Sequence, residues 1–203
     1  YRNYEGSTHG ATVASIAVGQ HDGYGVMGLA PHAEVDQFNP FDETGTASWD
    51  DIKRGMKFFA RQKSEIVNLS LGVDGYVLHK EWYGIFSDSG VMNTRNRALD
   101  DTLFIKAAGN AGITQMEDIF WDGLDEHERL ILVGSVNSKN EISAFSNRPG
   151  KSCFLDEGQC TERLMNRFLV APGELILVQD NNNDLYRVSG TSIATPMVTG
   201  AAA

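Results

Sequence analysis

The chain has 203 residues, of which 41% are hydrophobic and 22% charged, a size and composition that suit one globular domain or a large part of one. Its net charge of −10 and its lack of any Lys/Arg-rich run argue against a nucleic-acid partner, because phosphate binding needs a basic patch. No apolar run has membrane-spanning length, so neither a transmembrane helix nor a signal peptide is expected within the chain.

Both ends of the chain suggest a piece of a longer protein. The first residue is Tyr1 rather than methionine, and the last residues form an apolar run that begins at Met197. We therefore expect residues 1–203 to be a partial domain, truncated at both ends.

Two helices are expected in the first half of the chain. The first spans about residues 48–62, where apolar residues recur on one helical face. Ser48 and Asp51 can bind the free amides of its first turn, and acidic residues there suit the helix dipole. The second helix is expected at residues 91–99.

Three short aliphatic stretches predict buried strands at residues 65–71, 103–108 and 129–134. Strand and helix alternate, which favours an α/β domain: a three-layer sandwich whose mainly parallel, doubly wound sheet is flanked by helices. Residues 73–89 and 147–166 read as long irregular loops or insertions.

Nearer the C-terminus, three further stretches read as extended: residues 168–172, 174–178 and 185–189. Residues 180–184 between the last two are all Asp or Asn, which favours a hairpin turn over a calcium loop because the glycine and final glutamate of a calcium loop are absent.

Two cysteines, Cys153 and Cys160, lie in one polar stretch. A disulfide between them would imply an oxidising compartment, whereas two free thiols would suit the cytosol, and the spacing leaves both readings open. A zinc site is disfavoured because no further Cys or His lies nearby to complete it.

The strongest chemical signal is the segment Ser189-Gly-Thr-Ser-Ile-Ala-Thr-Pro196, which passes from a strand into an apolar helix. One serine at a helix start is ordinarily a simple cap. Here, however, Gly190 allows close approach beside Ser192, and the string resembles the nucleophile motif G-T-S-x-A-x-P of subtilisin-like serine proteases, the subtilases.

Two more segments carry the same resemblance in the family's order. His9-Gly-Ala-Thr-Val-Ala14 resembles the subtilase base motif, and Ala107-Ala-Gly-Asn110 resembles the motif whose asparagine helps to hold the oxyanion. The resemblance thus implies Ser192 as nucleophile, His9 as base and Asn110 as oxyanion donor. It also implies a pocket for the residue before the scissile bond, lined by Ser70, Leu71, Gly72, Ala107, Ala108 and Gly109.

Subtilases run in the order Asp, His, Ser, but only eight residues precede His9 here. No residue of the chain can take the aspartate's role, so we expect the aspartate to lie outside the chain and this stretch alone to be nearly inactive. Two other hypotheses are weighed. A non-catalytic subtilase-fold protein would be expected to have lost Ser192, His9 or Asn110, and an α/β-hydrolase would need G-x-S-x-G with its serine before its histidine.

The resemblance implies a serine endopeptidase that acts on proteins or peptides through an acyl-enzyme, without a cofactor for the chemistry. It further implies secretion or display on a bacterial surface, regulation by a propeptide or inhibitor, and structural calcium, for which no ligands can be named. The segment from Ser146 to Glu174, with its cysteine-bearing loop, is similar to bacterial autotransporter subtilases.

Overall fold

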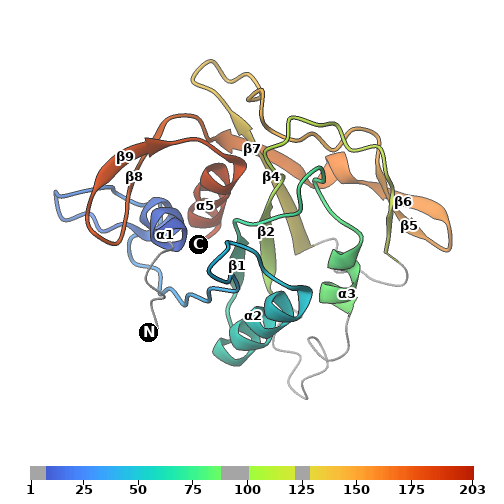
Figure 1. The fold of residues 1–203 in the computed structure, drawn as a ribbon, viewed down its shortest axis with the longest axis horizontal. Coiled ribbons are helices and arrows are strands. Elements are labelled where there is room, and N and C mark those ends of the chain that lie inside the picture. The colour runs from blue at the N-terminus through green and yellow to red at the C-terminus, as the bar shows by residue number, and fades with distance from the viewer. Residues whose placement is uncertain (1–7, 88–100, 122–128) are drawn as a thin grey trace.

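A four-stranded parallel sheet forms the centre of the molecule (Figure 1). The computed structural model describes residues 8–87, 101–121 and 129–203. The strands lie in the order β1 (Ile66–Leu69), β2 (Leu103–Ala107), β4 (Leu130–Val136) and β7 (Phe168–Pro172), and each neighbouring pair is parallel. Their carboxyl ends therefore meet at one edge of the sheet.

Helices cover both faces of this sheet, and successive side chains of β2 pack against helices on opposite faces. Phe104 packs into the larger core cluster with α2 (Trp49–Gln62) and α3 (Glu81–Ser87), whereas Ile105 packs on the opposite face with α5 (Thr191–Ala202). The helix α1 (His9–Val18) contacts α5 on that second face (Figure 1). The predicted α/β architecture with flanking helices is confirmed.

The start of α2 shows how local sequence determines an element. The Ser48 hydroxyl accepts a hydrogen bond from the Asp51 amide, and the Asp51 carboxylate accepts one from the Ser48 amide. This reciprocal capping box satisfies amides that the helix cannot pair itself. The helix predicted at residues 48–62 is confirmed, and the one predicted at residues 91–99 lies outside the described residues.

A hairpin near the C-terminus is formed by β8 (Ile176–Gln179) and β9 (Leu185–Val188). In its turn, the Asp180 carboxylate accepts hydrogen bonds from the amides of Asn182 and Asp184, at 2.8 and 3.0 Å. The predicted plain hairpin turn is therefore present, built by a side chain that mimics a backbone acceptor.

The expectation of long irregular loops was wrong in part. Residues 73–89 contain α3, whose apolar side chains are buried in the core, and residues 147–166 contain the antiparallel strands β5 (Cys153–Asp156) and β6 (Gln159–Arg163). A third strand, β3 (Ile119–Phe120), pairs with β5, and a short 3₁₀ helix, η2 (Leu164–Arg167), follows β6. Burial of aromatic side chains against distant segments, rather than local pattern, orders both stretches.

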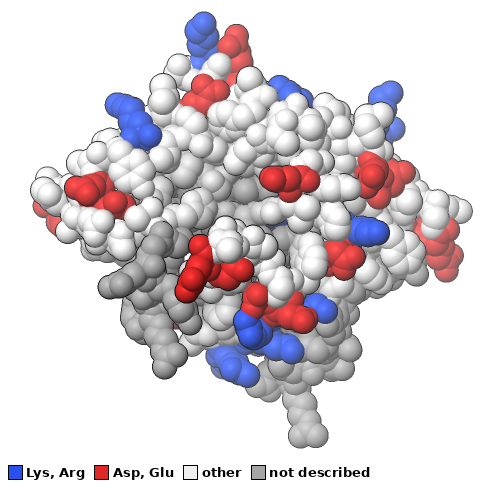
Figure 2. Space-filling model, viewed as in Figure 1, with Lys and Arg blue, Asp and Glu red and all other residues white. Residues whose placement is uncertain are grey.

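On the face shown in Figure 2, Lys and Arg side chains are scattered and interleaved with Asp and Glu. Across the described parts of the chain, no helix is both long and apolar enough to cross a bilayer.

Candidate active site

The three residues predicted to carry the chemistry begin or follow regular elements. His9 is the first residue of α1 and Ser192 the second residue of α5, while Asn110 lies shortly after the carboxyl end of β2. Because α1 and α5 pack together and α5 also contacts β1 and β2, three segments distant in the sequence meet at one edge of the sheet. Loops at the carboxyl ends of parallel strands are a common place for such sites.

The backbone carbonyl of Ser192 is bound by the end of β1 because Pro196 leaves it without a partner inside the helix. Proline has no N–H, so the Ser192 carbonyl lacks the donor that residue i+4 of a helix normally supplies. The Ser70 hydroxyl takes that place and donates to the Ser192 carbonyl at 2.8 Å. Ser70 directly follows β1, so the start of α5 is joined to the end of a core strand at the serine itself.

The carboxamide of Asn110 is oriented by Thr191. Its oxygen accepts hydrogen bonds from the backbone amide of Thr191 at 2.8 Å and from the Thr191 hydroxyl at 2.9 Å. The same hydroxyl accepts a hydrogen bond from the Gly109 amide at 3.0 Å. With the oxygen committed in this way, the Nδ2 donor of Asn110 points away from Thr191.

Gly190 lies beside the side chains of both Ser192 and Asn110. A Cβ placed on Gly190 would lie 3.2 Å from the Ser192 hydroxyl and 3.6 Å from Nδ2 of Asn110, so both groups border the same small volume. A side chain at position 190 would crowd this volume. The glycine thus keeps this volume free of a side chain.

The imidazole of His9 lies at the same place but does not bond to Ser192. Its Nε2 lies 3.1 Å from the carbonyl oxygen of Ser70, and the side chain is exposed. Among the described residues, no carboxylate is hydrogen-bonded to the ring and the ring makes no hydrogen bond to the Ser192 hydroxyl. Ser70 therefore contacts both residues, and in the absence of substrate such catalytic bonds are often unformed.

The six residues predicted to line a pocket follow two adjacent strands. Ser70, Leu71 and Gly72 follow β1, whereas Ala107 ends β2 and Ala108 and Gly109 follow it. Gly72 is exposed, Ser70, Leu71 and Gly109 are half-buried, and Ala107 and Ala108 are buried. The structure thus brings the two predicted walls side by side, while the side chains of the two alanines pack in the core.

A residue whose role the sequence did not reveal, Asn147, holds the loop after β2. Its oxygen accepts from the amides of Ala111 and Ile113, and its nitrogen donates to the carbonyls of Tyr76 and Ala108. This buried side chain uses its full hydrogen-bonding capacity for backbone groups. It ends the segment Ser143-Ala-Phe-Ser-Asn147, whose resemblance to a subtilase motif is the signal that the sequence offers.

Gly109, the residue before Asn110, makes that loop geometry accessible. Its φ of +97° is a conformation that side chains disfavour, and a Cβ there would lie 2.5 Å from the Asn147 nitrogen and 3.0 Å from the Tyr76 carbonyl oxygen. Position 109 therefore requires glycine if Asn147 is to brace the loop after β2.

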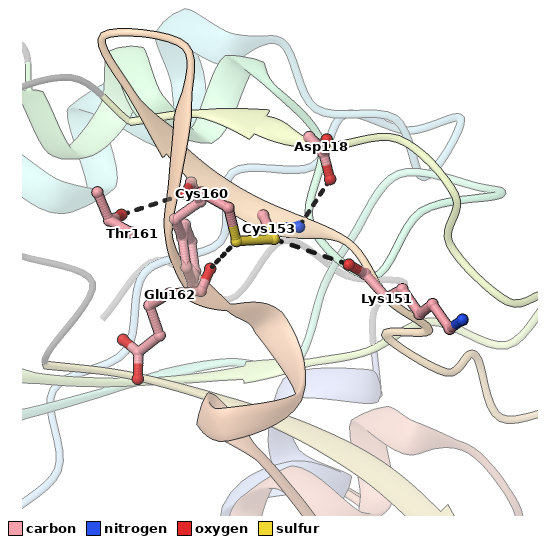
Figure 3. The surroundings of a disulfide bond; sticks show 7 residues. Asp118, Lys151, Cys153, Cys160, Thr161 and Glu162 are labelled. Carbon is pink, nitrogen blue, oxygen red and sulfur yellow. Dashed lines mark hydrogen bonds between the residues drawn. A yellow bond between two sulfur atoms is a disulfide. The ribbon is translucent and has the colours of Figure 1, made fainter.

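Cys153 and Cys160 form a disulfide that bridges β5 and β6 (Figure 3). Their Cα atoms lie 5.4 Å apart, and the Cys153 amide donates to the Asp118 carboxylate at 2.8 Å. Of the two readings that the sequence left open, the structure contains the bonded one. The described parts of the chain contain no group of three or more His, Cys, Asp or Glu side chains arranged to hold a metal ion.

The profile of the Subtilase family (Peptidase_S8) matches residues 1–203, the whole of the chain. The chain belongs to the subtilase family. Its curated relatives include a thermophilic serine proteinase of Bacillus sp. (strain AK1), 29% identical over 97% of this chain, and an intracellular serine protease of Paenibacillus polymyxa, 29% identical over 100% of it. The chain covers 42% and 54% of those two subtilases, so it spans about half the length of the relatives that it matches.

Solved subtilase structures have the same fold. The patellamide maturation protease PatA superposes with a TM-score of 0.70 at 27% identity, over 97% of this chain and 64% of that one. The prenylagaramide maturation protease PagA gives a TM-score of 0.68 at 27% identity, over 98% of this chain and 64% of that one. The subtilisin-like fold expected from the three motifs is therefore confirmed.

Proposed function

We propose that the protein containing this chain is a serine endopeptidase in which Ser192 is the nucleophile, His9 the general base and Asn110 an oxyanion donor. The observation that carries the proposal is the shared volume beside Gly190, bordered by the Ser192 hydroxyl at 3.2 Å and the Asn110 amide at 3.6 Å. A peptide carbonyl carbon within bonding reach of that hydroxyl would place its oxygen near the amide donor. Family membership and serine proteinase relatives support the same chemistry.

In the proposed reaction, the Ser192 hydroxyl attacks the peptide carbonyl while His9 takes the hydroxyl proton. The carbonyl oxygen becomes an oxyanion that accepts hydrogen bonds from Nδ2 of Asn110 and from the backbone amide of Ser192. When the intermediate collapses, the C–N bond breaks and His9 passes its proton to the leaving amine. Water, deprotonated by His9, then attacks the acyl carbon, the ester bond to Ser192 breaks, and His9 returns the proton to the Ser192 oxygen. No cofactor takes part.

The triad aspartate is proposed to come from a strand upstream of Tyr1, so that residues 1–203 are part of a longer catalytic domain. The His9 ring is consistent with this proposal, because within the described residues its hydrogen bond goes to the Ser70 carbonyl rather than to a carboxylate. The aspartate would fix the ring's tautomer and turn it toward Ser192, and its loss from a related triad costs about 10⁴ in kcat.

A fluorophosphonate probe tests the assignment, because it labels only a serine activated by a base. A chain extended upstream to include an aspartate-bearing strand should be labelled at Ser192, and Ser192→Ala should abolish labelling. Residues 1–203 alone should react at least about 10³-fold more slowly. Peptide mapping by mass spectrometry identifies the labelled residue.

Ser189→Ala is the matched control, since this exposed hydroxyl lies in the same motif but accepts a hydrogen bond from the Leu175 amide. It should leave labelling of Ser192 intact. A folded, extended protein that takes up no probe would favour the non-catalytic subtilase-fold alternative and refute the peptidase.

We also propose that the protein is exported, as a secreted or surface-displayed bacterial protease. The disulfide supports this proposal, because such bonds persist mainly in oxidising compartments. Relatives named as extracellular and as intracellular both match the chain, so similarity alone does not choose between them. Proteins or peptides are the proposed substrates, a propeptide or inhibitor is a proposed regulator, and structural calcium is retained as a family-based proposal.

A further inference from the structure

Lys106 is a cation buried in the middle of the central sheet. It lies in β2, is 1% exposed, and shares a face of the strand with Phe104. Its ammonium nitrogen, Nζ, donates to the carbonyls of Val77 at 3.0 Å and Ala107 at 2.8 Å, and lies 5.5 Å from the centre of the Trp82 ring. An ammonium has three donors, so two are used within the described chain.

No carboxylate neutralises this charge among the described residues. Salt bridges there join other residues, and burial alone lowers the pKa of Lys106 to about 7. A buried ammonium without a counter-ion is costly, and the two carbonyls and the Trp82 face offset only part of that cost. When Lys106 is protonated, its charge therefore has no counter-ion among the described residues.

Beside Nζ lies a space that no described side chain fills. A Cβ placed on Gly72 would have Nζ of Lys106 at 3.5 Å as its single heavy-atom neighbour within 4 Å in the described chain. Gly72 is exposed whereas Lys106 is 1% exposed, so a surface residue without a side chain adjoins the buried amine. The amine borders the space from within.

This space belongs to the neighbourhood of the candidate site. Gly72 lies two residues after Ser70, which contacts both His9 and Ser192. On the other strand, Ala107 accepts the hydrogen bond from Nζ and lies three residues before Asn110. The amine therefore lies behind both predicted walls of the pocket.

We propose that Lys106 makes this pocket selective for an acidic side chain in the substrate residue that precedes the scissile bond. The carboxylate enters the space beside Gly72 and accepts a hydrogen bond from the third donor of Nζ. Charge-assisted bonds of this kind are the strongest that a peptide side chain offers, and the substrate supplies the counter-ion that the described chain lacks. This inference rests on the proposed peptidase function.

The test compares peptides that differ only in Glu, Gln or Leu before the scissile bond, cleaved by the upstream-extended protein. The kcat/KM for Glu should exceed that for the isosteric Gln by about 10- to 100-fold, the range expected for a hydrogen bond to a charged group. Lys106→Met retains the apolar stem without the charge. It should lower kcat/KM for the Glu peptide at least about ten-fold more than for the Leu peptide.

Lys80→Met is the matched control, because this lysine is exposed and lies in the same stretch as Val77. It should leave the Glu-to-Gln ratio unchanged. A second variant, Gly72→Ala, puts a methyl group 3.5 Å from Nζ and should reduce cleavage after Glu more than cleavage after Leu. If Lys106→Met fails to fold, the proposal is tested by the Glu-to-Gln ratio of kcat/KM in the parent protein and by the effect of Gly72→Ala on cleavage after Glu.

The failures are distinguishable. If the kcat/KM values for the Leu, Gln and Glu peptides are equal, the proposed role of Lys106 is overturned and the peptidase function stands. The lysine would then only join Val77 to Ala107 by hydrogen bonds. A protein that takes up no fluorophosphonate and cleaves none of the peptides would overturn the peptidase itself, and the inference with it.

Discussion

At the scale of single residues, the two ends of the Asn110 carboxamide have different tasks. The oxygen is held by the amide and the hydroxyl of Thr191, and this leaves the nitrogen free to donate toward the volume that Ser192 borders. A donor fixed before the reaction begins needs no reorganisation when negative charge develops, which is why such groups are effective. Thr191 is in this view a positioning residue for Asn110.

Substituting these two residues should separate the donor from its support. In the upstream-extended protein, Asn110→Ala should lower kcat by about 10²- to 10³-fold with little change in KM, as loss of one such donor does in subtilisin. Thr191→Val keeps the donor but removes the hydroxyl, and should lower kcat by up to about ten-fold. Steady-state kinetics on a Glu peptide measures both.

Thr44→Val, in an exposed turn, serves as the control for a lost threonine hydroxyl and should leave kcat unaltered. Should the two site variants raise KM and spare kcat instead, Asn110 would bind substrate rather than stabilise the oxyanion.

At the scale of elements, the hairpin of β5 and β6 is held by covalent and non-covalent means. Its disulfide closes a loop with a sequence separation of seven, and Phe154 of β5 packs in the main core cluster. In Figure 1 this hairpin lies at the opposite end of the molecule from α1 and α5. We therefore expect it to contribute to stability rather than to catalysis.

Removing the disulfide with the double change Cys153→Ala and Cys160→Ala should lower the free energy of unfolding by about 2 kcal/mol, the value expected for so short a loop. The rate of Ser192 labelling should stay the same. Urea unfolding with and without reductant measures the effect: reductant should destabilise the parent protein and leave the double variant unaffected. Slower labelling of the variant in its folded state would show that the hairpin supports the site.

Elements with a local cause could be predicted from the sequence, and elements with a tertiary cause could not. The capping pair Ser48 and Asp51 lies within one turn, so the start of α2 was readable, as were the aliphatic strands of the central sheet. The helix α3 depends on burial of Trp82 and Phe86 against distant strands, and its stretch was read as a loop. Motif likeness located Ser192, whereas the brace formed by Asn147 needed three dimensions.

For Lys106, the sequence predicts burial but not the contacts of the side chain. It lies within the stretch of residues 103–108 that was predicted to be a buried strand, and it is buried. A charged residue inside such a stretch was a signal that sequence reasoning passed over. What the sequence could not supply was the location of its amine, which depends on Val77 and Gly72, residues of another segment.

At the scale of the whole molecule, burial of Lys106 links folding to pH. Its pKa is about 7 in the folded chain, against an ordinary value of 10.5. Between these values the unfolded chain binds the extra proton, so stability rises as pH rises from about 7 toward 10.5. Below about 7 both states are protonated and the full cost of the buried charge is present.

The difference in unfolding free energy between the parent chain and Lys106→Met isolates this effect, since other groups cancel. That difference should shift in favour of the parent by about 1 kcal/mol per pH unit between roughly pH 7.5 and 9.5, because each pKa unit corresponds to about 1.4 kcal/mol. Chemical denaturation at several pH values measures it. If the unfolding free energies of the parent chain and of Lys106→Met change equally with pH across this range, the amine has the same pKa in the folded and unfolded chain.

Pro196, which has no N–H, leaves the Ser192 carbonyl to be bound from outside the helix. In a helix without proline at position 196, the amide of that residue would pair with the Ser192 carbonyl. Here the Ser70 hydroxyl, at the end of β1, makes that hydrogen bond instead, so we expect a movement of that strand end to shift the backbone of Ser192.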